Sequence, residues 1–122
     1  MGWSFWKRDM VSTEKYIPDK GDLVWIDFNA TKGHEQSGRR PAFVVSPRIY
    51  NEKIGLALLC PITSKVKNYP FEVVTNGKYV SGVILADQIH SFDWRFRNII
   101  KIETTSNKVI GDVKSKILAL IS

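Results

Sequence analysis

Apolar residues occur in short runs separated by polar and turn-forming residues, a pattern typical of β-strands. Residues 22–28 (DLVWIDF) form the first run, directly after the turn signal Pro-Asp-Lys-Gly. A second run covers residues 41–46, and a third, 56–63 (LALLCPIT), is apolar enough to predict a strand buried on both faces. Further strands are expected over residues 71–75, 80–89 and 99–103.

The segments between these runs differ in character. Residues 29–40 form a polar loop that is longer than a usual hairpin connection, which suggests a functional element. Residues 48–54 predict a helical turn or a loop. Asn76 and Gly77 form a dipeptide that favours a hairpin turn between two strands.

Helical spacing of apolar residues occurs only near the C-terminus. From Lys108 onward, one helix face carries Val109, Val113, Ile117, Leu120 and Ile121, and Ser106 or Asn107 can serve as the N-cap. Five to seven short strands followed by one helix predict a mainly β fold with α: a curled antiparallel sheet or small barrel with a C-terminal helix. A length of 122 residues predicts a single domain.

The amino-acid composition indicates that the protein binds a charged partner. With 43% hydrophobic residues the chain can bury a core, and dimerisation would bury more surface. Lysine and arginine total 18 against 12 for aspartate and glutamate, which gives a net charge of +6. This excess favours a polyanion as the partner.

The single cysteine and the N-terminal residues bear on the cellular compartment in which the protein is expected. Cys60 has no second cysteine to pair with, so a reducing cytoplasm fits, and its apolar context predicts core packing. The N-terminal residues include Trp3 and Trp6 but resemble neither a signal peptide nor a membrane span. We therefore expect a cytoplasmic protein without a membrane segment.

The loop before the second strand carries the most informative polar residues. In GHEQSGRRP, Glu35, Arg39 and Arg40 place both signs of charge on a flexible segment rooted in a strand. Such a loop often handles a phosphate group. On composition alone, a hairpin tip with solvated charges is the better-supported alternative.

Three sequence segments in a fixed order favour the functional loop over the solvated hairpin tip. They are YIPDKGDLVWIDFNATKGHEQSGRRPAFVVSP, PITSKVKNYPFEVV and SGVILADQIHSFDWRFR, and together they resemble the MazF/PemK/Kid family of bacterial toxins, which are sequence-selective endoribonucleases of toxin–antitoxin pairs. The resemblance runs from about Tyr16 to the C-terminus. It suggests a toxin domain over residues 10–122, with residues 1–9 as an N-terminal extension.

The resemblance implies a fold, a reaction and partners. The fold would be an SH3-like barrel paired into a homodimer. The reaction would be metal-independent cleavage of single-stranded mRNA at a short motif, which leaves 2′,3′-cyclic phosphate and 5′-OH ends and arrests translation and growth. The partners would be the RNA and an acidic, MazE-like antitoxin.

The resemblance also implies three catalytic residues. Arg40, directly before proline in GRRP, matches the family's catalytic arginine, and its guanidinium suits the negative charge that develops on a phosphate. Thr63 matches the family's catalytic threonine, although a threonine that caps the next turn is the simpler alternative. Glu35 matches the family's loop glutamate and would orient Arg40 or accept a proton.

Asp87 requires a separate comparison. It resembles the carboxylate that acts as the base in the Kid branch, but that branch has an arginine where this chain has Leu85. This departure favours the MazF-type arrangement of arginine and threonine. Asp87 and Gln88 remain candidates for substrate contact, and a structural carboxylate at a strand end is an equal alternative for Asp87.

The remaining candidates are groups that bind single-stranded RNA by stacking, base-edge hydrogen bonds or phosphate contacts. They are Phe28, Asn29, Arg39, Ser64, Lys65, Lys67, Trp94, Arg95 and Arg97, with Tyr50, Asn51 and Tyr69 also near matched segments. Packing in the core or at a dimer interface is an equal alternative for the aromatic and amide members.

The candidate residues do not include a metal-ligand cluster. His34 and His90 are isolated and the aspartates are scattered, so neither a metal nor a cofactor is expected. Two other functions stay open: a non-enzymatic gyrase poison of the CcdB type on the same barrel, and an RNA-binding barrel without activity. The GHEQSGRRP loop together with Thr63 favours the nuclease, because a toxin that only binds has no need of them.

Overall fold

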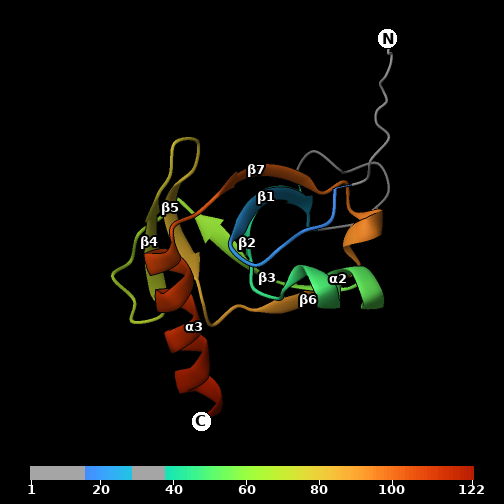
Figure 1. Cartoon of the computed structure of the whole chain (residues 1–122). Helices are drawn as coiled ribbons and strands as arrows, with labels where there is room; N and C mark the ends of the chain where they lie inside the picture. The colour runs from blue at the N-terminus through green and yellow to red at the C-terminus, as the bar shows by residue number, and fades with distance from the viewer. Residues whose placement is uncertain (1–15, 29–37) are drawn as a thin grey trace.

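The computed structural model describes residues 16–28 and 38–122 (Figure 1). The strands in these ranges are β1 Asp22–Asp27, β2 Arg39–Val44, β3 Ala57–Thr63, β4 Glu72–Asn76, β5 Ser81–Leu85, β6 His90–Phe92 and β7 Ile100–Thr104. The helices are α2 Arg48–Ile54, the 3₁₀ helix η1 Trp94–Phe96 and α3 Asn107–Ile121. None of the helices within the described ranges is long and apolar enough to span a membrane.

The strands form one antiparallel sheet in the order β4-β5-β3-β2-β1-β7, with β6 also paired to β3. The sheet curls strongly, and α3 lies against its β4–β5 end (Figure 1). Strand β3 is the centre: β2 pairs with one edge, while β6 and β5 share the other, at Ala57↔Phe92 and Ile62↔Ile84 respectively. The predicted mainly β fold with a curled antiparallel sheet and a C-terminal helix is confirmed.

Side chains alternate between the two faces of the strands and fill two core clusters. Cys60 and Ile62 of β3 belong to the cluster that contains Val113 of α3, while Ala57 and Leu59 belong to the cluster on the other face. Burial of β3 on both faces is confirmed at its centre, where Leu59 and Cys60 are completely buried.

The predicted C-terminal helix is confirmed, with one difference. The Ser106 hydroxyl caps it by accepting a hydrogen bond from the Val109 N–H at 3.2 Å. Val113 is buried, but Leu120 and Ile121 are exposed although the spacing placed them on the inner face. The cause is that the last turns of α3 extend past the edge of the sheet (Figure 1).

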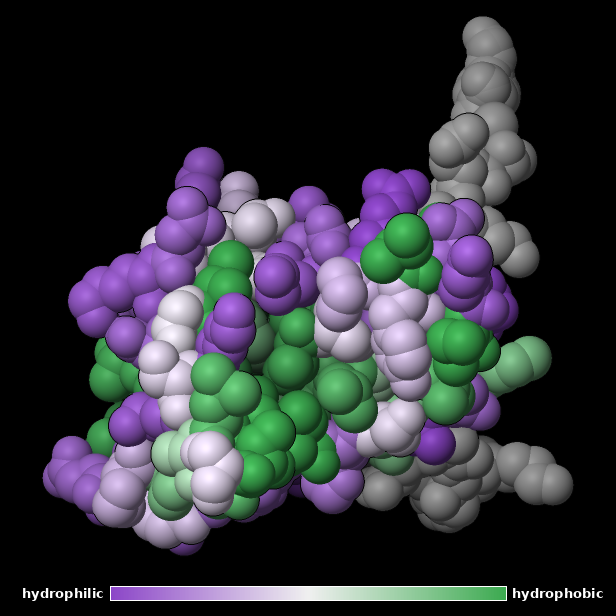
Figure 2. All heavy atoms as spheres, turned by 60° about the horizontal axis from the view of Figure 1, so that its bottom comes forward, coloured by the Kyte–Doolittle hydropathy of each residue, from purple (hydrophilic) through white to green (hydrophobic). Residues whose placement is uncertain are grey.

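Apolar side chains also gather on the outside of the molecule, on the face shown in Figure 2. Between α3 and the sheet lies a groove of about 240 Å³, whose lining includes Phe43, Val45, Ile110, Ile117 and Leu118. An exposed apolar surface of this kind is typical of a site that a protein partner covers.

Two predicted strand boundaries were wrong. Strand β2 begins at Arg39 and not at residue 41, because pairing with β1 continues through Ile26↔Arg40 and Asp27↔Arg39. The predicted strand 80–89 is two strands, since the chain turns at residues 86–89 to leave β5 and pair with an earlier part of β3. Both arginines therefore lie on a strand and not on the loop.

The expected hairpin at Asn76 and Gly77 is confirmed, with Asn76 as the last residue of β4 and residues 77–80 as the connection. Glu103 of β7 accepts hydrogen bonds from the backbone N–H groups of Lys78, Tyr79 and Val80 at 2.9–3.0 Å. This carboxylate ties the hairpin to the far edge of the curled sheet.

Glu103→Gln is expected to lower the free energy of unfolding at neutral pH by about 1 kcal/mol, the difference between hydrogen bonds to a charged and to a neutral acceptor. Partial desolvation acts to raise the pKa of Glu103, but the three N–H groups and the Lys78 ammonium lower it below the usual value. The carboxylate thus stabilises the fold above its ordinary pKa, and this contribution is lost as the pH falls through the lowered value. Urea unfolding at several pH values measures the effect.

The matched control for this prediction is Glu52→Gln, because the Glu52 side chain is exposed on α2. The difference between wild type and Glu103→Gln should shrink in acid while the control stays near wild type. An acid-independent difference would contradict the role of the carboxylate charge.

Candidate active site

The register between β2 and β3 brings two of the predicted catalytic residues together. Ala42↔Pro61 is the last pair between β2 and β3, and Arg40 and Thr63 each lie two residues beyond it on their strands. The alternation of side chains also puts Arg40 on the same face as Ala42, and Thr63 on the same face as Pro61. Two residues 23 positions apart in the sequence thus come to line one pocket.

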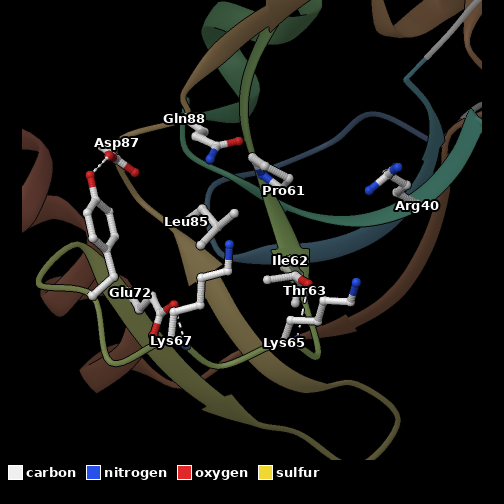
Figure 3. A pocket seen from close by; sticks show the side chains of 11 residues that line it. Arg40, Pro61, Ile62, Thr63, Lys65, Lys67, Glu72, Leu85, Asp87 and Gln88 are labelled. Atoms are coloured by element: carbon white, nitrogen blue, oxygen red, sulfur yellow. Dashed lines mark hydrogen bonds between the residues drawn. The ribbon is translucent and has the colours of Figure 1, made fainter.

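These two residues line a pocket of about 360 Å³ between β2, β3, β5 and the segment 64–71 (Figure 3). Seven residues considered from the sequence as catalytic or RNA-binding lie in its wall: Arg40, Thr63, Lys65, Lys67, Tyr69, Asp87 and Gln88. The other lining residues are Pro61, Ile62, Glu72 and Leu85. Ser64, another candidate, is exposed next to Thr63.

Thr63 has a defined local role. Its hydroxyl oxygen accepts a hydrogen bond from the Lys65 N–H at 3.2 Å, which is the turn-capping contact expected for a threonine at a strand end. A hydroxyl that accepts one hydrogen bond keeps its own proton for donation to a ligand. Capping and ligand binding are therefore compatible in this residue.

Close approach of β5 supports the position of Thr63. A Cβ atom at Gly82 would lie 2.5 Å from the Thr63 carbonyl oxygen, so only glycine allows the two backbones to come this near. The adjacent pair Thr63↔Val83 fixes the register.

The segment 64–71 is held over the pocket by two acidic residues. The Lys67 N–H donates to Glu72 Oε2 at 3.0 Å, and the Tyr69 hydroxyl donates to Asp87 Oδ2. The hydrogen bond to Asp87, followed by desolvation and the charge of Asp87, raises the pKa of the Tyr69 hydroxyl. Tyr69 therefore stays a proton donor to the carboxylate at neutral pH.

Cys60 lies close enough to Asp87 for the charge of Asp87 to affect the thiol. Burial, with a smaller contribution from the Asp87 charge, raises the pKa of the thiol to about 12. The thiol therefore stays protonated, and the predicted burial of Cys60 in the core is confirmed.

Several predicted RNA-binding residues lie elsewhere. Arg39 faces away from Arg40 on β2 and lies over the Trp25 ring at 5.6 Å. Trp94 is only 4% exposed, and its Nε1–H donates to the Asn51 carbonyl at 3.1 Å. Phe28 packs edge-on against a core aromatic ring at 4.9 Å. The structure thus places Trp94 in the core and keeps all three residues out of the pocket.

The alternation of Arg95 and Arg97 after Trp94 suggests one strand face with two arginines, but this interpretation is wrong because residues 94–96 form a 3₁₀ helix. Arg97 Nη1 donates to the carbonyls of Asp27 and Phe28 at 3.1 and 2.7 Å, which anchors the end of β1. Arg95 Nη2 donates to the Glu52 carbonyl at 2.6 Å. Both guanidiniums therefore bind the protein's own backbone.

The other candidates are structural, remote or outside the described ranges. Asn51 is fully buried and donates to the carbonyls of Pro18 and Ser46, so it is not available to read a base. Tyr50 is partly exposed on α2. Glu35 and Asn29 lie outside the described residues.

Glu72 and Leu85 are pocket residues that the sequence did not reveal. They come from β4 and β5, and their approach to β3 depends on the strand order, for which the sequence carries no local signal.

Over residues 16–28 and 38–122, no three histidine, cysteine, aspartate or glutamate side chains group closely enough to hold a metal ion.

Comparison with known proteins gives a consistent result. The family described as PemK-like, MazF-like toxin of type II toxin–antitoxin system matches residues 19–121. The chain is 50% identical over 107 residues to the endoribonuclease toxin MazF of Escherichia coli (strain K12), which covers 88% of this chain and 96% of that protein. It is 28% identical over 109 residues to the endoribonuclease toxin ChpB of the same strain, with coverage of 84% and 93%.

Solved structures agree in fold as well as sequence. MazF (form I) from Deinococcus radiodurans matches with a TM-score of 0.78 and 46% identity, covering 88% of this chain and 98% of that one. The MazE–MazF complex (form II) from the same organism matches with a TM-score of 0.78 and 42% identity, at the same coverage.

Proposed function

This chain belongs to the family of PemK-like, MazF-like toxins of type II toxin–antitoxin systems, and from this membership and the pocket geometry we propose where and how it cuts RNA. It is an endoribonuclease toxin. A gyrase poison and an inactive RNA-binding barrel, the two other functions considered, find no support in these relatives. We assign the toxin domain to residues 10–122, with residues 1–9 as an extension.

The proposed reaction is attack of a ribose 2′-OH on the adjacent phosphorus in single-stranded mRNA. The 5′-oxygen of the next nucleotide leaves and takes up a proton, which yields a 2′,3′-cyclic phosphate and a 5′-OH end. The reaction needs donors that hold the negative charge of the phosphorane and groups that move two protons. It requires the 2′-OH, so DNA is not a substrate.

Arg40 and Thr63 supply the donors in this proposal. The planar, positively charged guanidinium of Arg40 presents two parallel N–H groups to the phosphate oxygens. The Thr63 hydroxyl donates its free proton to the same phosphate. The observation that supports the assignment is that both side chains line one pocket, just beyond the pairing of β2 with β3.

Other residues have supporting roles. Lys65 and Lys67 are exposed at the pocket and attract the flanking phosphates. Glu35, from the loop that precedes β2, is proposed to orient Arg40 or to accept a proton. The cleavage of many mRNAs would then arrest translation and growth.

We also propose the assembly and the partner. The MazE–MazF complex from Deinococcus radiodurans supports a MazE-like antitoxin as the partner. The proposed antitoxin is acidic, and the proposed location of both proteins is the cytoplasm. The exposed apolar residues Leu118, Leu120 and Ile121 of α3 and the groove beside them support a homodimer.

Cleavage of single-stranded RNA is expected to persist in excess EDTA, because the proposed charge stabilisation comes from Arg40, Thr63 and the lysines and not from a metal ion. An RNA oligonucleotide and its all-DNA counterpart are incubated with the purified protein, with and without EDTA, and the product ends are analysed. Cyclic phosphate ends in both RNA samples and intact DNA are the expected outcome. Loss of RNA cleavage on chelation, with recovery on addition of magnesium, would contradict the mechanism.

A further inference from the structure

The pocket has two ends of opposite charge. In Figure 3, Arg40 and Asp87 lie on opposite sides, with Pro61 and Leu85 between them. Arg40, Thr63 and Lys65 form the end that suits a phosphate, while Asp87 would repel one. A substrate that extends across the pocket therefore meets Asp87 with a part other than its phosphate.

Only one of the two carboxylate oxygens of Asp87 accepts a hydrogen bond from the described residues. Its Oδ2 accepts the hydrogen bond from the Tyr69 hydroxyl, which orients the carboxylate. Its Oδ1 is shielded from water and has no hydrogen-bond partner among the described residues. A shielded charged acceptor without a donor is costly, so a ligand that supplies a donor there gains free energy.

We propose that Asp87 Oδ1 accepts a hydrogen bond from the exocyclic amino group of a nucleobase next to the scissile bond, and that Tyr69 is the positioning residue that holds the carboxylate for this contact. The inference rests on the pocket being the cleavage site. Carboxylates accept hydrogen bonds from such amino groups when proteins read base edges. Asp87 is therefore a specificity residue, and uracil, which has no amino group, is disfavoured at that position.

The structure separates positioning of Asp87 from anchoring of the segment that carries Tyr69. The Lys67 N–H is bound to Glu72 independently of Tyr69, so this segment stays attached when the Tyr69 hydroxyl is removed. Tyr69 is also 44% exposed, so Tyr69→Phe removes one hydroxyl without opening a cavity in the core.

The test measures base discrimination by the full-length protein. A cleaved site is first found in an RNA pool, and each base around it is then replaced by an analogue without its amino group: purine riboside for adenosine, inosine for guanosine, zebularine for cytidine. The ratio of kcat/KM with and without the amino group is measured for wild type, Tyr69→Phe, Asp87→Ala and the double variant. Tyr79→Phe is the matched control, since Tyr79 is exposed on the β4–β5 connection.

In wild type and Tyr79→Phe, removal of one amino group should lower kcat/KM about tenfold, the scale of one base-specific contact. The ratio should fall to within about twofold of unity in Asp87→Ala and to an intermediate value in Tyr69→Phe, and Tyr69→Phe should have no further effect in the Asp87→Ala background. If the ratio in Tyr69→Phe equals that of wild type, or the two substitutions act multiplicatively, the inference is wrong. Tyr69→Phe alone decides the matter if Asp87→Ala does not fold.

Arg40→Ala, assayed beside these variants, keeps this inference apart from the site assignment. If Arg40→Ala cleaves as fast as wild type, the pocket itself is misassigned. If it is slow while Tyr69→Phe retains full discrimination, only the role of Tyr69 and Asp87 fails.

Discussion

Arg40→Ala is expected to lower the rate of RNA cleavage by about two to three orders of magnitude, the loss typical of removing a donor to a developing oxyanion. The guanidinium holds charge that is larger in the phosphorane than in the substrate, so the rate should fall far more than binding. Single-turnover cleavage of a short RNA with excess protein measures the rate, and fluorescence anisotropy of a non-cleavable 2′-deoxy analogue measures binding.

Arg39→Ala is a closely matched control. The two arginines are adjacent on β2 and share their charge and length, but Arg39 points to the opposite face, over Trp25. Its removal should alter salt-sensitive binding and leave the bound rate nearly unchanged. Arg40→Lys should be intermediate, because an ammonium keeps the charge but not the planar pair of donors.

Thr63 completes the same prediction. Thr63→Val removes the hydroxyl and keeps the shape of the side chain, and it should also slow cleavage, while Thr63→Ser should retain most of the rate. Wild-type rates in both Arg40→Ala and Thr63→Val would show that the catalytic assignment is wrong.

The strands and α3 were predictable because their signals are local. Runs of β-forming residues marked β1 and β3, and the spacing of Val109, Val113 and Ile117 marked the helix. The exposure of Ile121 was not predictable, since the spacing gives the face of a helix but not how far the sheet beneath it extends.

Arg40 and Thr63 were identified as separate candidates, but their juxtaposition was not predictable from spacing. It depends on the β2–β3 register, and a shift of one residue would turn one of them to the other face. Motifs that match the family suggested each residue, and the curled sheet brings both to one pocket.

The assignments around Trp94 failed for a physical reason. WRFR alternates like a strand with two exposed arginines, but the carbonyls at the end of β1 need donors and Arg97 supplies them. These carbonyl acceptors lie about 70 residues away from Arg97 in the sequence, so no local sequence pattern indicates the contact. The contact between Tyr69 and Asp87 was hidden for the same reason.

A co-expressed acidic antitoxin that competes with RNA for the pocket is expected to suppress cleavage to about 1% when its free concentration is 100 times its Kd and the RNA concentration is far below KM. Arg40, Lys65 and Lys67 are exposed around this pocket, so an acidic disordered segment that folds on binding can cover the same cations that hold phosphates. Apolar anchors in that segment would add affinity that salt does not screen.

Purified toxin is titrated with the antitoxin at several RNA concentrations and two salt concentrations. Inhibition should be overcome by more RNA and should weaken with salt, though less steeply if the apolar anchors dominate. Lys65→Glu with Lys67→Glu should weaken both RNA binding and inhibition, while Lys53→Glu, exposed on α2, should weaken neither. If the toxin–antitoxin complex cleaves RNA as fast as the free toxin, the antitoxin does not cover this pocket.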